Sequence, residues 1–351
     1  MKALKKRKNQ IRLIIVTCAL ILASCSLFAV FNALGGGLTS QHAAERFKGE
    51  SEQLFAQVSA YFPVGSEVTE MDIYNFDVTL EGDFVTASLE AEGNGSLYKQ
   101  AYSGTSTVTV ESEKASTQCT AVGVWGDYFF FHPLELRSGN YFSSDDLMHD
   151  YVILDEELAW RLFGGFDLAG MTVMIGNEPY VIAGVISRED DFASKKAYTQ
   201  GAGLYMSYDK LCAIDETKIN TFELVSADPI EGFAKSEVEK VFTKAEVVEN
   251  SARFSVFSIF KVIGSFAERS MNTTGVILPY WENAARYIEN IMAVVLIFAI
   301  LLAVFPFVVA VIGLVELIKY GVRAIKEKLP EYIEKRREER YWKKMQQRGE
   351  G

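Results

Sequence analysis

The residues with the clearest chemical pattern lie near the N-terminus. Leu22-Ala23-Ser24-Cys25 has the form of a lipobox, in which a signal peptide is cut before a cysteine that then carries a lipid. A basic segment and an apolar segment precede it, as in such signals. However, the apolar run continues past Cys25 to Phe31, whereas the apolar part of a signal peptide covers only about 7–15 residues. The sequence therefore predicts that Cys25 stays inside a membrane helix, with lipidation as the alternative.

Three further cysteines are present. Cys18 lies in the same apolar segment as Cys25. Cys119 and Cys212 lie in the central region, where a disulfide would be chemically permitted outside the cytoplasm. Two cysteines do not define a disulfide framework, and nothing in the sequence brings this pair together. Two separate buried thiols are therefore favoured over a Cys119–Cys212 disulfide.

No pattern typical of catalysis or metal binding stands out elsewhere. The 3 histidines are scattered, and the acidic runs lack the glycine and the spacing of a calcium loop. Ser-x-x-Lys occurs repeatedly but without the companion motifs of the enzymes that use it. Neither G-x-S-x-G nor H-E-x-x-H is present. We therefore expect no catalytic, cofactor-binding or metal-binding residues, and a protein that is not an enzyme.

The charge of the chain is divided by region. The 351 residues carry a formal net charge of −11, which argues against a nucleic-acid partner, because binding phosphates requires a basic surface. Met1–Arg12 contains six lysines and arginines and no acid, and the segment after Leu317 is also basic. The acids lie mostly between these ends. Because short cytoplasmic flanks of membrane helices are rich in lysine and arginine, this pattern predicts two cytoplasmic ends around an external acidic domain.

Two uncharged segments are long enough to cross a bilayer, which requires about 20 apolar residues. The first is Leu13–Leu34 and the second is Ile291–Val315, which contains Pro306 and should be kinked there. The sequence thus predicts a two-pass protein of the plasma membrane. Its expected parts are a cytoplasmic N-terminus (1–12), a first span (13–34), an extracytoplasmic domain (35–286), a second span (287–317) and a cytoplasmic tail (318–351).

The central region mixes strand and helix patterns without a regular parallel rhythm, which predicts an α+β domain. Asp155 should cap a short helix that ends at Gly164-Gly165, and Gly93-Asn94-Gly95 should form a turn. The predicted helices are Gln41–Tyr61, as an outward continuation of the first span, Glu156–Phe163 and Ile230–Phe242. The predicted strands are Ile73–Leu80, Phe84–Leu89, Thr105–Val110, Ala121–Val124, Tyr151–Leu154, Met171–Ile175, Tyr180–Ser187 (a hairpin with the preceding strand around Gly176-Asn177), Gly203–Met206, Thr221–Val225 and Ala245–Val248.

An ordered series of segments resembles the extracytoplasmic core domain of MacB-type ABC transporter permeases. The series comprises "GVWGDYF" (123–129), "LELRSGNYFSSDD" (134–146), "YVILDEELAWRLFGG" (151–165) and "LAGMTVMIGNEPYVIAGVI" (168–186), and "FNALGGG" (31–37) resembles the exit of that family's first membrane helix. The resemblance implies a domain like the porter and sabre parts of MacB. It also implies structural roles for Gly139, Tyr141, Phe142, Leu162, Phe163, Gly164, Gly170, Gly176, Gly184 and Val185.

The sequence departs from that family in two respects. Family permeases resemble a unit with one span before the domain and three after it, whereas this sequence has one after it. No G-x-x-x-x-G-K-[ST] motif of an ATPase occurs in the 351 residues. The resemblance therefore implies a permease-like subunit that works with a separate ABC ATPase, and with a multi-span permease as a further candidate partner. A homodimer or heterodimer is the expected assembly.

The basic tail has helical spacing, with Ile318, Val322, Ile325 and Leu329 on one face. Pro330 is expected to end one helix and open a second, which carries Tyr341-Trp342. The tail would lie on the inner surface of the bilayer or bind the cytoplasmic ATPase.

Two functions follow as hypotheses. In the first, a subunit of a MacB-type transporter passes motion from the ATPase to the external domain. In the alternative, a membrane-tethered sensor or adaptor binds a peptide or envelope component without an ATPase.

Overall fold

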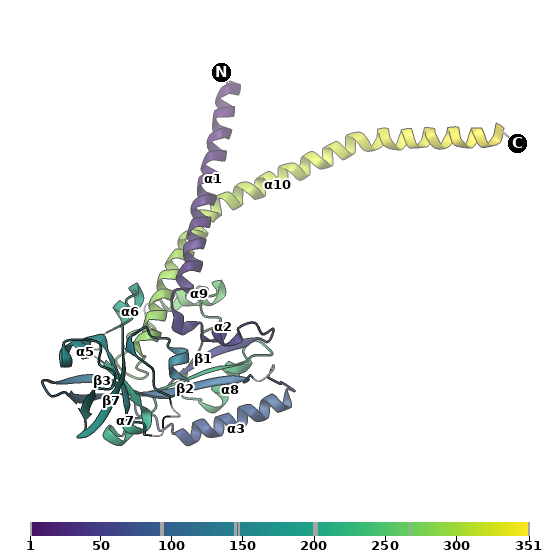
Figure 1. Cartoon of the computed structure of the whole chain (residues 1–351). Coiled ribbons are helices and arrows are strands. Elements are labelled where there is room, and N and C mark those ends of the chain that lie inside the picture. The colour runs from purple at the N-terminus through teal and green to yellow at the C-terminus, as the bar shows by residue number, and fades with distance from the viewer. Residues whose placement is uncertain are drawn as a thin grey trace. The chain divides into compact units, whose positions relative to one another are not determined.

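The computed structural model describes residues 2–91, 95–143, 146, 148–198, 203–266 and 268–349 (Figure 1). The chain divides into two compact units. Unit 1 comprises Met1–Phe31 and Val295–Gly351, and unit 2 comprises Asn32–Val294. Of the predicted turn at Gly93-Asn94-Gly95, the first two residues lie outside the described residues, as do Ser144 and Asp145 of the family-like segment 134–146.

Unit 1 consists of helical segments from α1 (Lys2–Gly35) and α10 (Tyr280–Gly349). Both helices are long and apolar enough to cross a membrane by length and composition, and their most apolar windows are mostly exposed. Ser24 of α1 is buried, and its hydroxyl donates a hydrogen bond to the backbone carbonyl of Ala299 in α10 at 3.0 Å. Small residues at such positions let two helices approach closely.

The prediction that Pro330 separates two helices is wrong, because α10 runs through both Pro306 and Pro330. A proline removes only one backbone donor, and strong helix formers flank Pro330 on both sides. The side chains of Tyr341 and Trp342 lie outside those that the structure describes.

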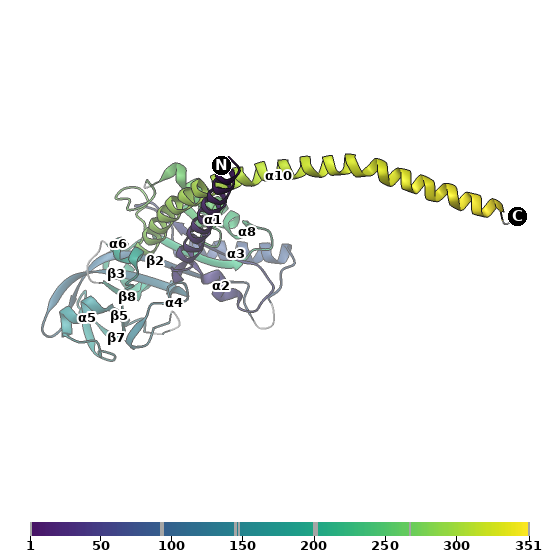
Figure 2. The same ribbon diagram turned by 90° about the horizontal axis from the view of Figure 1, so that it is seen from above.

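Unit 2 is built on a mixed sheet of ten strands among the described residues, in the order β10-β1-β9-β2-β3-β8-β5-β7-β4, with β6 paired to β2 and β7. Strands β2, β3, β5, β7 and β8 of this sheet are labelled in Figure 2. The pairs β3–β8 and β5–β7 are parallel, and the other pairs are antiparallel. The predicted α+β class is confirmed. The strands are β1 (Phe55–Tyr61), β2 (Tyr98–Glu111), β3 (Ser116–Gly126), β4 (Leu136–Gly139), β5 (Tyr151–Asp155), β6 (Thr172–Ile175), β7 (Glu178–Ile186), β8 (Gly203–Ser207), β9 (Thr221–Ala227) and β10 (Glu246–Glu249).

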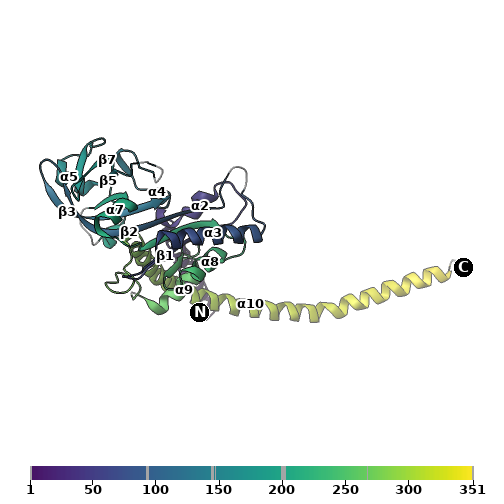
Figure 3. The ribbon, with the colours of Figure 1, turned by 90° about the horizontal axis from the view of Figure 1, so that it is seen from below.

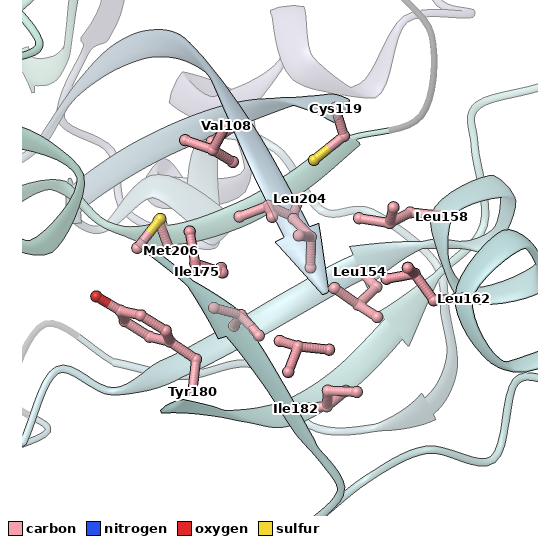
Figure 4. Packing of buried hydrophobic residues seen from close by; sticks show 14 of the residues in the cluster. Val108, Cys119, Leu154, Leu158, Leu162, Ile175, Tyr180, Ile182, Leu204 and Met206 are labelled. Atoms are coloured by element: carbon pink, nitrogen blue, oxygen red, sulfur yellow. The ribbon is translucent and has the colours of Figure 1, made fainter. Parts of the chain in front are cut away.

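Helices cover both faces of the sheet. Seen from below, α3 (Glu70–Thr86) and α8 (Phe233–Val241) lie in front of β1 (Figure 3). Ile73, Phe76 and Leu80 of α3 pack there against β1 and β9. On the same face, α5 and α7 cover the half formed by β3, β5, β7 and β8. Leu158 and Leu162 of α5 pack there against Leu154 and Ile182 of the sheet (Figure 4). The remaining helices are α2 (Ala43–Lys48), α4 (Tyr128–Phe131), α5 (Glu156–Phe163), α6 (Phe192–Ala197), α7 (Tyr208–Asp215) and α9 (Val256–Val262), with short 3-10 turns η1 (Thr39–Gln41) and η2 (Ile263–Ser265).

Several local predictions are confirmed by the structure. Asp155 accepts a hydrogen bond from the backbone N–H of Leu158 and caps α5, whose bounds agree with the prediction. Gly164 ends α5 in the left-handed conformation, with a φ of 72°. The hairpin of β6 and β7 turns at Gly176-Asn177. The strands predicted around 105–110, 121–124, 203–206, 221–225 and 245–248 correspond to β2, β3, β8, β9 and β10, and the helix predicted at 230–242 corresponds to α8.

The predicted strands Ile73–Leu80 and Phe84–Leu89 are wrong, because residues 70–86 form α3. The buried residues of this segment are Ile73, Phe76, Leu80 and Phe84, which recur every three or four positions. This spacing is helical, and the β-branched residues between them lie on the outer face. A capping box formed by Thr69 and Asp72 starts the helix.

The predicted helix Gln41–Tyr61 is also wrong beyond its first turns. Gly49, at a φ of 51°, ends α2, and β1 follows from Phe55. Residues 56–61 are all buried, so β1 lies in the sheet with both faces covered. Such a strand lacks the alternation of apolar and polar residues that would distinguish it from a helix.

We predict that Gly139→Ala destabilises unit 2. Gly139 pairs with Gly184 across β4 and β7 and has a φ of 73°. A Cβ atom at Gly139 would lie 2.1 Å from the carbonyl oxygen of Ala183. The expected loss in free energy of unfolding is at least about 2 kcal/mol. It would be measured by chemical unfolding of the purified chain followed by tryptophan fluorescence. Gly165→Ala, where a Cβ atom meets nothing within 4 Å, is the control; equal stability of the two variants would contradict the prediction.

We predict that Asp77→Asn stabilises the protein at neutral pH. Burial raises the pKa of Asp77 from 3.8 to about 6; the hydrogen bond from Gln100 opposes this rise, and the charge of Glu81 adds to it. Because the pKa in the folded state exceeds that in the unfolded state, the stability that the proton provides is lost as pH rises from about 4 to about 6. After allowance for partial exposure, the variant should gain on the order of 1 kcal/mol at pH 7 and nothing near pH 4.

The test for Asp77 is a series of unfolding midpoints between pH 4 and pH 7. Asp190→Asn, at a side chain that is 91% exposed, is the control for loss of a surface charge. A difference between wild type and Asp77→Asn that is independent of pH would refute the assignment.

Candidate functional site: a buried ion-pair cluster

Three charged residues lie on one face of the first turns of α10. Glu282, Arg286 and Glu289 are spaced by four and three residues, so they line one side of the helix. All three belong to unit 2 and have at most 2% of their surface exposed. Charged side chains are almost never buried to this extent unless they are paired. Their partners therefore define what the start of α10 is attached to.

Arg253 is the central partner, and it comes from the loop after β10. Its guanidinium forms two hydrogen bonds with Glu282, at 2.7 and 3.0 Å, and one with Glu289 at 2.9 Å. It also donates to the side-chain oxygen of Gln41 in η1 at 2.7 Å. Arg253 thus joins α10 to the segment that directly follows α1.

Arg286 extends the cluster toward β10. Its Nε atom lies 2.6 Å from Glu282, and its Nη2 atom lies 2.6 Å from Glu246 at the start of β10. Arg269 pairs with the second oxygen of Glu289 at 2.8 Å. These contacts balance three arginines (Arg253, Arg269 and Arg286) against three glutamates (Glu246, Glu282 and Glu289). We call Gln41, Arg253, Glu282, Arg286 and Glu289, with the outer residues Glu246 and Arg269, the Arg253 cluster.

The electrostatics of the cluster favour the charged forms of Arg253 and Glu282. Burial lowers the pKa of Arg253, but the charges of Glu282 and Glu289 outweigh it and raise that pKa overall. For Glu282, burial raises the pKa, and the charges of Arg253 and Arg286 outweigh it and lower the pKa overall. A buried charge without its partner costs several kcal/mol, so each member of the cluster depends on the others.

The polar face of β1 connects this cluster to the sheet. Tyr61 donates a hydrogen bond to Glu282 at 3.2 Å. Two residues earlier, Ser59 accepts from Asn250 at 2.8 Å and lies 3.4 Å from Glu223 of β9. Two residues earlier again, Gln57 accepts from the backbone N–H of Ala43 and donates to the carbonyl of Ser40. Alternate residues of one buried strand therefore bind both the segment after α1 and the start of α10.

A second buried pair lies beside these contacts. His132, which follows α4, and Glu223 are 2.6 Å apart, and each side chain is 2% exposed. The ring of Trp281, the second residue of α10, lies 4.3 Å from the ring of His132. The start of α10 is thus held by ion pairs on one side and by aromatic packing on another.

The chemistry of the Arg253 cluster is that of a structural joint. Its central side chains have no access to solvent, so no substrate reaches them. Among the described residues, no group of three or more histidine, cysteine, aspartate or glutamate side chains could hold a metal ion. A neighbouring cavity of about 360 Å³ is mostly apolar and is lined in part by Phe62, Lys218, Ile277 and Trp281.

The residues that the family resemblance singled out lie away from this cluster, and the structure gives them packing and turn positions. Tyr141 stacks on Phe129 at 4.6 Å, and Phe142 meets the same ring edge-on at 5.4 Å. Leu162 and Val185 are buried in the core under α5, and Phe163 packs against it. The left-handed φ values of Gly139, Gly164, Gly170 and Gly176 fit turns or helix ends, and Gly184 faces Gly139.

The cysteines are all free thiols in the structure. Cys119 is buried in the core under α5, and burial raises the pKa of its thiol to about 12. Cys212 packs against the other core, the one under α3. Cys18 and Cys25 lie on exposed positions of α1.

Sequence reasoning missed the Arg253 cluster. The available signal was the pattern Glu282-x-x-x-Arg286-x-x-Glu289 directly before an apolar segment. A charged face on a helix usually indicates a solvated surface, and only the fold reveals that Arg253 and Gln41 cover this one.

Comparisons with known proteins place these features in context. The family model described as the MacB-like periplasmic core domain matches residues 13–229, which is more than half of the chain. A curated relative is the macrolide export ATP-binding/permease protein MacB of Chromobacterium violaceum, 26% identical over 83 residues. That match covers 23% of this chain and only 13% of the relative.

Two solved structures are similar at low identity. One is the extracellular domain of the noncanonic ABC-type transporter YknZ from Gram-positive bacteria, with 16% identity and a TM-score of 0.38, covering 55% of this chain and 99% of that one. The other is the periplasmic region of MacB from Actinobacillus actinomycetemcomitans, with 17% identity and a TM-score of 0.41, covering 62% of this chain and 94% of that one.

We predict that Glu282→Ala severely destabilises unit 2, because it leaves Arg253 and Arg286 buried without their shared partner. The expected loss is about 3–5 kcal/mol in free energy of unfolding, measured by chemical unfolding in detergent. Glu239→Ala is the control, since it removes an exposed glutamate 3.7 Å from Lys235 and should cost at most about 1 kcal/mol. Similar losses in the two variants would show that the cluster does not hold α10.

Proposed function

This chain belongs to the family of the MacB-like periplasmic core domain, and we propose that it is a permease-like membrane subunit that works with a separate ABC ATPase. In this proposal it passes motion between the ATPase in the cytoplasm and unit 2 outside. The family is one of transporter permease-type proteins and not of catalytic domains, which supports a role other than an enzyme.

The observation that carries the proposal is the attachment of α10 to the sheet. The same helix contains the buried face of the Arg253 cluster and the apolar segment 291–315. A helix joined to a domain by a flexible linker would absorb a displacement. Here, displacement of the first turns of α10 relative to β1 would separate buried charges, at a cost of about 3–5 kcal/mol for a broken pair.

Transmission of motion also requires two arrangements whose balance the nucleotide changes. The rigid contacts of Arg253 and Gln41 support motion of unit 2 as one body, since they join both ends of its chain to the same strand. In this mechanism, binding and hydrolysis of ATP by the partner would move the cytoplasmic ends, and no substrate need pass between the helices.

In the proposed topology, the chain crosses the plasma membrane twice and both termini lie in the cytoplasm. It follows the predicted parts 1–12, 13–34, 35–286, 287–317 and 318–351. The basic residues of both ends support it, because they favour the cytoplasmic side. In this topology Cys25 remains within the first span, and the tail is the surface nearest to a cytoplasmic partner.

The proposed partners follow from the relative and from what these 351 residues contain. The relative's printed name joins an ATP-binding function and a permease function in one protein, and this chain spans 13% of its length. No phosphate-binding G-x-x-x-x-G-K-[ST] motif occurs in the chain. The proposal is completed by two partners, a separate ATPase and a multi-span permease subunit, in a homodimeric or heterodimeric assembly.

We predict that the full chain, isolated in mild detergent at its native expression level, brings with it a subunit that hydrolyses ATP. Truncation after Tyr320 removes the basic tail and should abolish this recovery. The readouts are ATP hydrolysis by the isolated material and identification of a P-loop sequence by mass spectrometry. As a control, the truncated chain must retain the unfolding midpoint of unit 2.

Two results would count against the proposal. Isolation of the full chain without an ATPase would favour the alternative, a tethered sensor or adaptor, for which the apolar cavity beside Trp281 is the candidate binding site. Recovery of the ATPase by both forms would refute docking through the tail.

A further inference from the structure

The short helix α9 exposes apolar side chains on the side opposite its core contacts. Ile259 and Val262 are buried, with 0% and 5% of their surface exposed. On the other side, Phe257 is 85% exposed and Phe260 is 57% exposed. The side chain of Ser255 caps the helix by accepting from the backbone N–H of Ser258. Large apolar side chains exposed together on one face indicate a contact surface, so a partner of this face is missing.

The position of α9 indicates what that partner is. Phe254, two residues before the first residue of α9, packs against Gly35, the last residue of α1, where a Cβ atom would lie 3.0 Å from the Cβ of Phe254. The same Cβ atom would lie 3.6 Å from the end of Met292, the second residue of the uncharged segment 291–315. Both places at which the chain leaves unit 2 toward its apolar helices are therefore adjacent to the start of α9 (Figure 1).

We propose that α9 is a membrane-surface anchor, whose exposed face, formed by Val256, Phe257, Phe260 and the following Phe266, inserts into the outer boundary between lipid headgroups and acyl chains. The inference rests on the two-span topology proposed above, which places Gly35 and Met292 at that boundary. It goes beyond that proposal because it assigns a lipid contact to unit 2 itself.

The composition of α9 fits a lipid surface. Phenylalanine side chains on one face of a short helix bury themselves about 5–10 Å into the interface. Lys261 is the only charged residue within α9, and its long side chain can extend to the headgroups while its methylene groups stay near the apolar layer. Because the chain as a whole is acidic, apolar burial rather than attraction to anionic lipids is the expected driving force.

Such an anchor would fix the tilt of unit 2 on the membrane. The residue before Phe254 is Arg253, the centre of the buried cluster that holds α10. Arg253, with its ion pairs, thus lies three residues before Val256, the first residue of α9. A change in the depth of α9 would act directly on the joint through which α10 is attached.

The test uses nitroxide labels on the full chain reconstituted in phosphatidylcholine vesicles. The four native cysteines are replaced, Cys119 by alanine and the others by serine, and unfolding of this background is compared with wild type. Single labels are then placed through Phe257→Cys and Phe260→Cys. Collision with oxygen, which concentrates in lipid, is compared with collision with a water-soluble nickel complex by electron paramagnetic resonance.

Two matched positions complete the design. Val85→Cys on α3 has a similar exposure, 79%, and Figure 1 shows α3 at a different end of unit 2 from α9. Leu22→Cys on α1 is 69% exposed and reports whether the first apolar helix lies in the bilayer. If the inference is right, the labels at Phe257, Phe260 and Leu22 lose access to nickel and gain access to oxygen, whereas the label at Val85 stays accessible to nickel.

The outcomes separate the inference from the topology. Lipid exposure at Leu22 together with nickel access at Phe257 and Phe260 equal to that at Val85 would overturn the anchor alone. Nickel access at Leu22 as well would overturn the two-span topology. Strong dipolar broadening between Phe257 labels at a low ratio of protein to lipid would identify a second copy of this chain as the occupant, and would also overturn the anchor.

Discussion

The contact between Arg253 and Glu282 is the constraint on which the rest of unit 2 depends. It buries two full charges, one from the loop after β10 and one from the first turns of α10, with 2% and 0% of the side chains exposed. These charges are tolerated only because Gln41, Glu289, Arg286 and Tyr61 complete their hydrogen bonds. The place of α10 on the sheet, the path of the chain after α1 and the loop before α9 therefore have to fit one another.

Ion pairs at this position fix the register and rotation of α10, which apolar packing would not do. A buried apolar contact can slide or rotate with little loss, and replacing buried ion pairs by apolar residues often leaves stability unchanged or higher. Hydrogen-bonded charges are satisfied in one register and one rotation of the helix, because each guanidinium fork must face its carboxylate. The cluster thus specifies how α10 meets β1 more than it adds to stability. Such specificity is what the proposed transmission of motion requires.

The sequence predicted those parts of the fold whose signals are local. Asp155, Gly164 and Gly176 each act within a few residues, so α5 and the β6–β7 hairpin could be recognised from sequence. The errors arose where burial on both sides removes the pattern, as in β1, or where β-branched residues occupy the outer face of a helix, as in α3. The cluster could not be predicted, because Gln41 and Arg253 meet only through a fold that joins residues 212 positions apart. The charged residues of the cluster on α10 have the sequence pattern of a solvated helix face.

The lipobox-like residues Leu22–Cys25 lie within α1, and one of them packs against α10. Ser24 is buried, and its hydroxyl binds the carbonyl of Ala299, so this small residue has a packing role that a cleaved signal would not need. Cleavage before Cys25 would remove this contact and one of the two helices that leave unit 2. Gln41, which follows α1, and Glu282 of α10 are both bound to Arg253, so the joint is built to receive two helices.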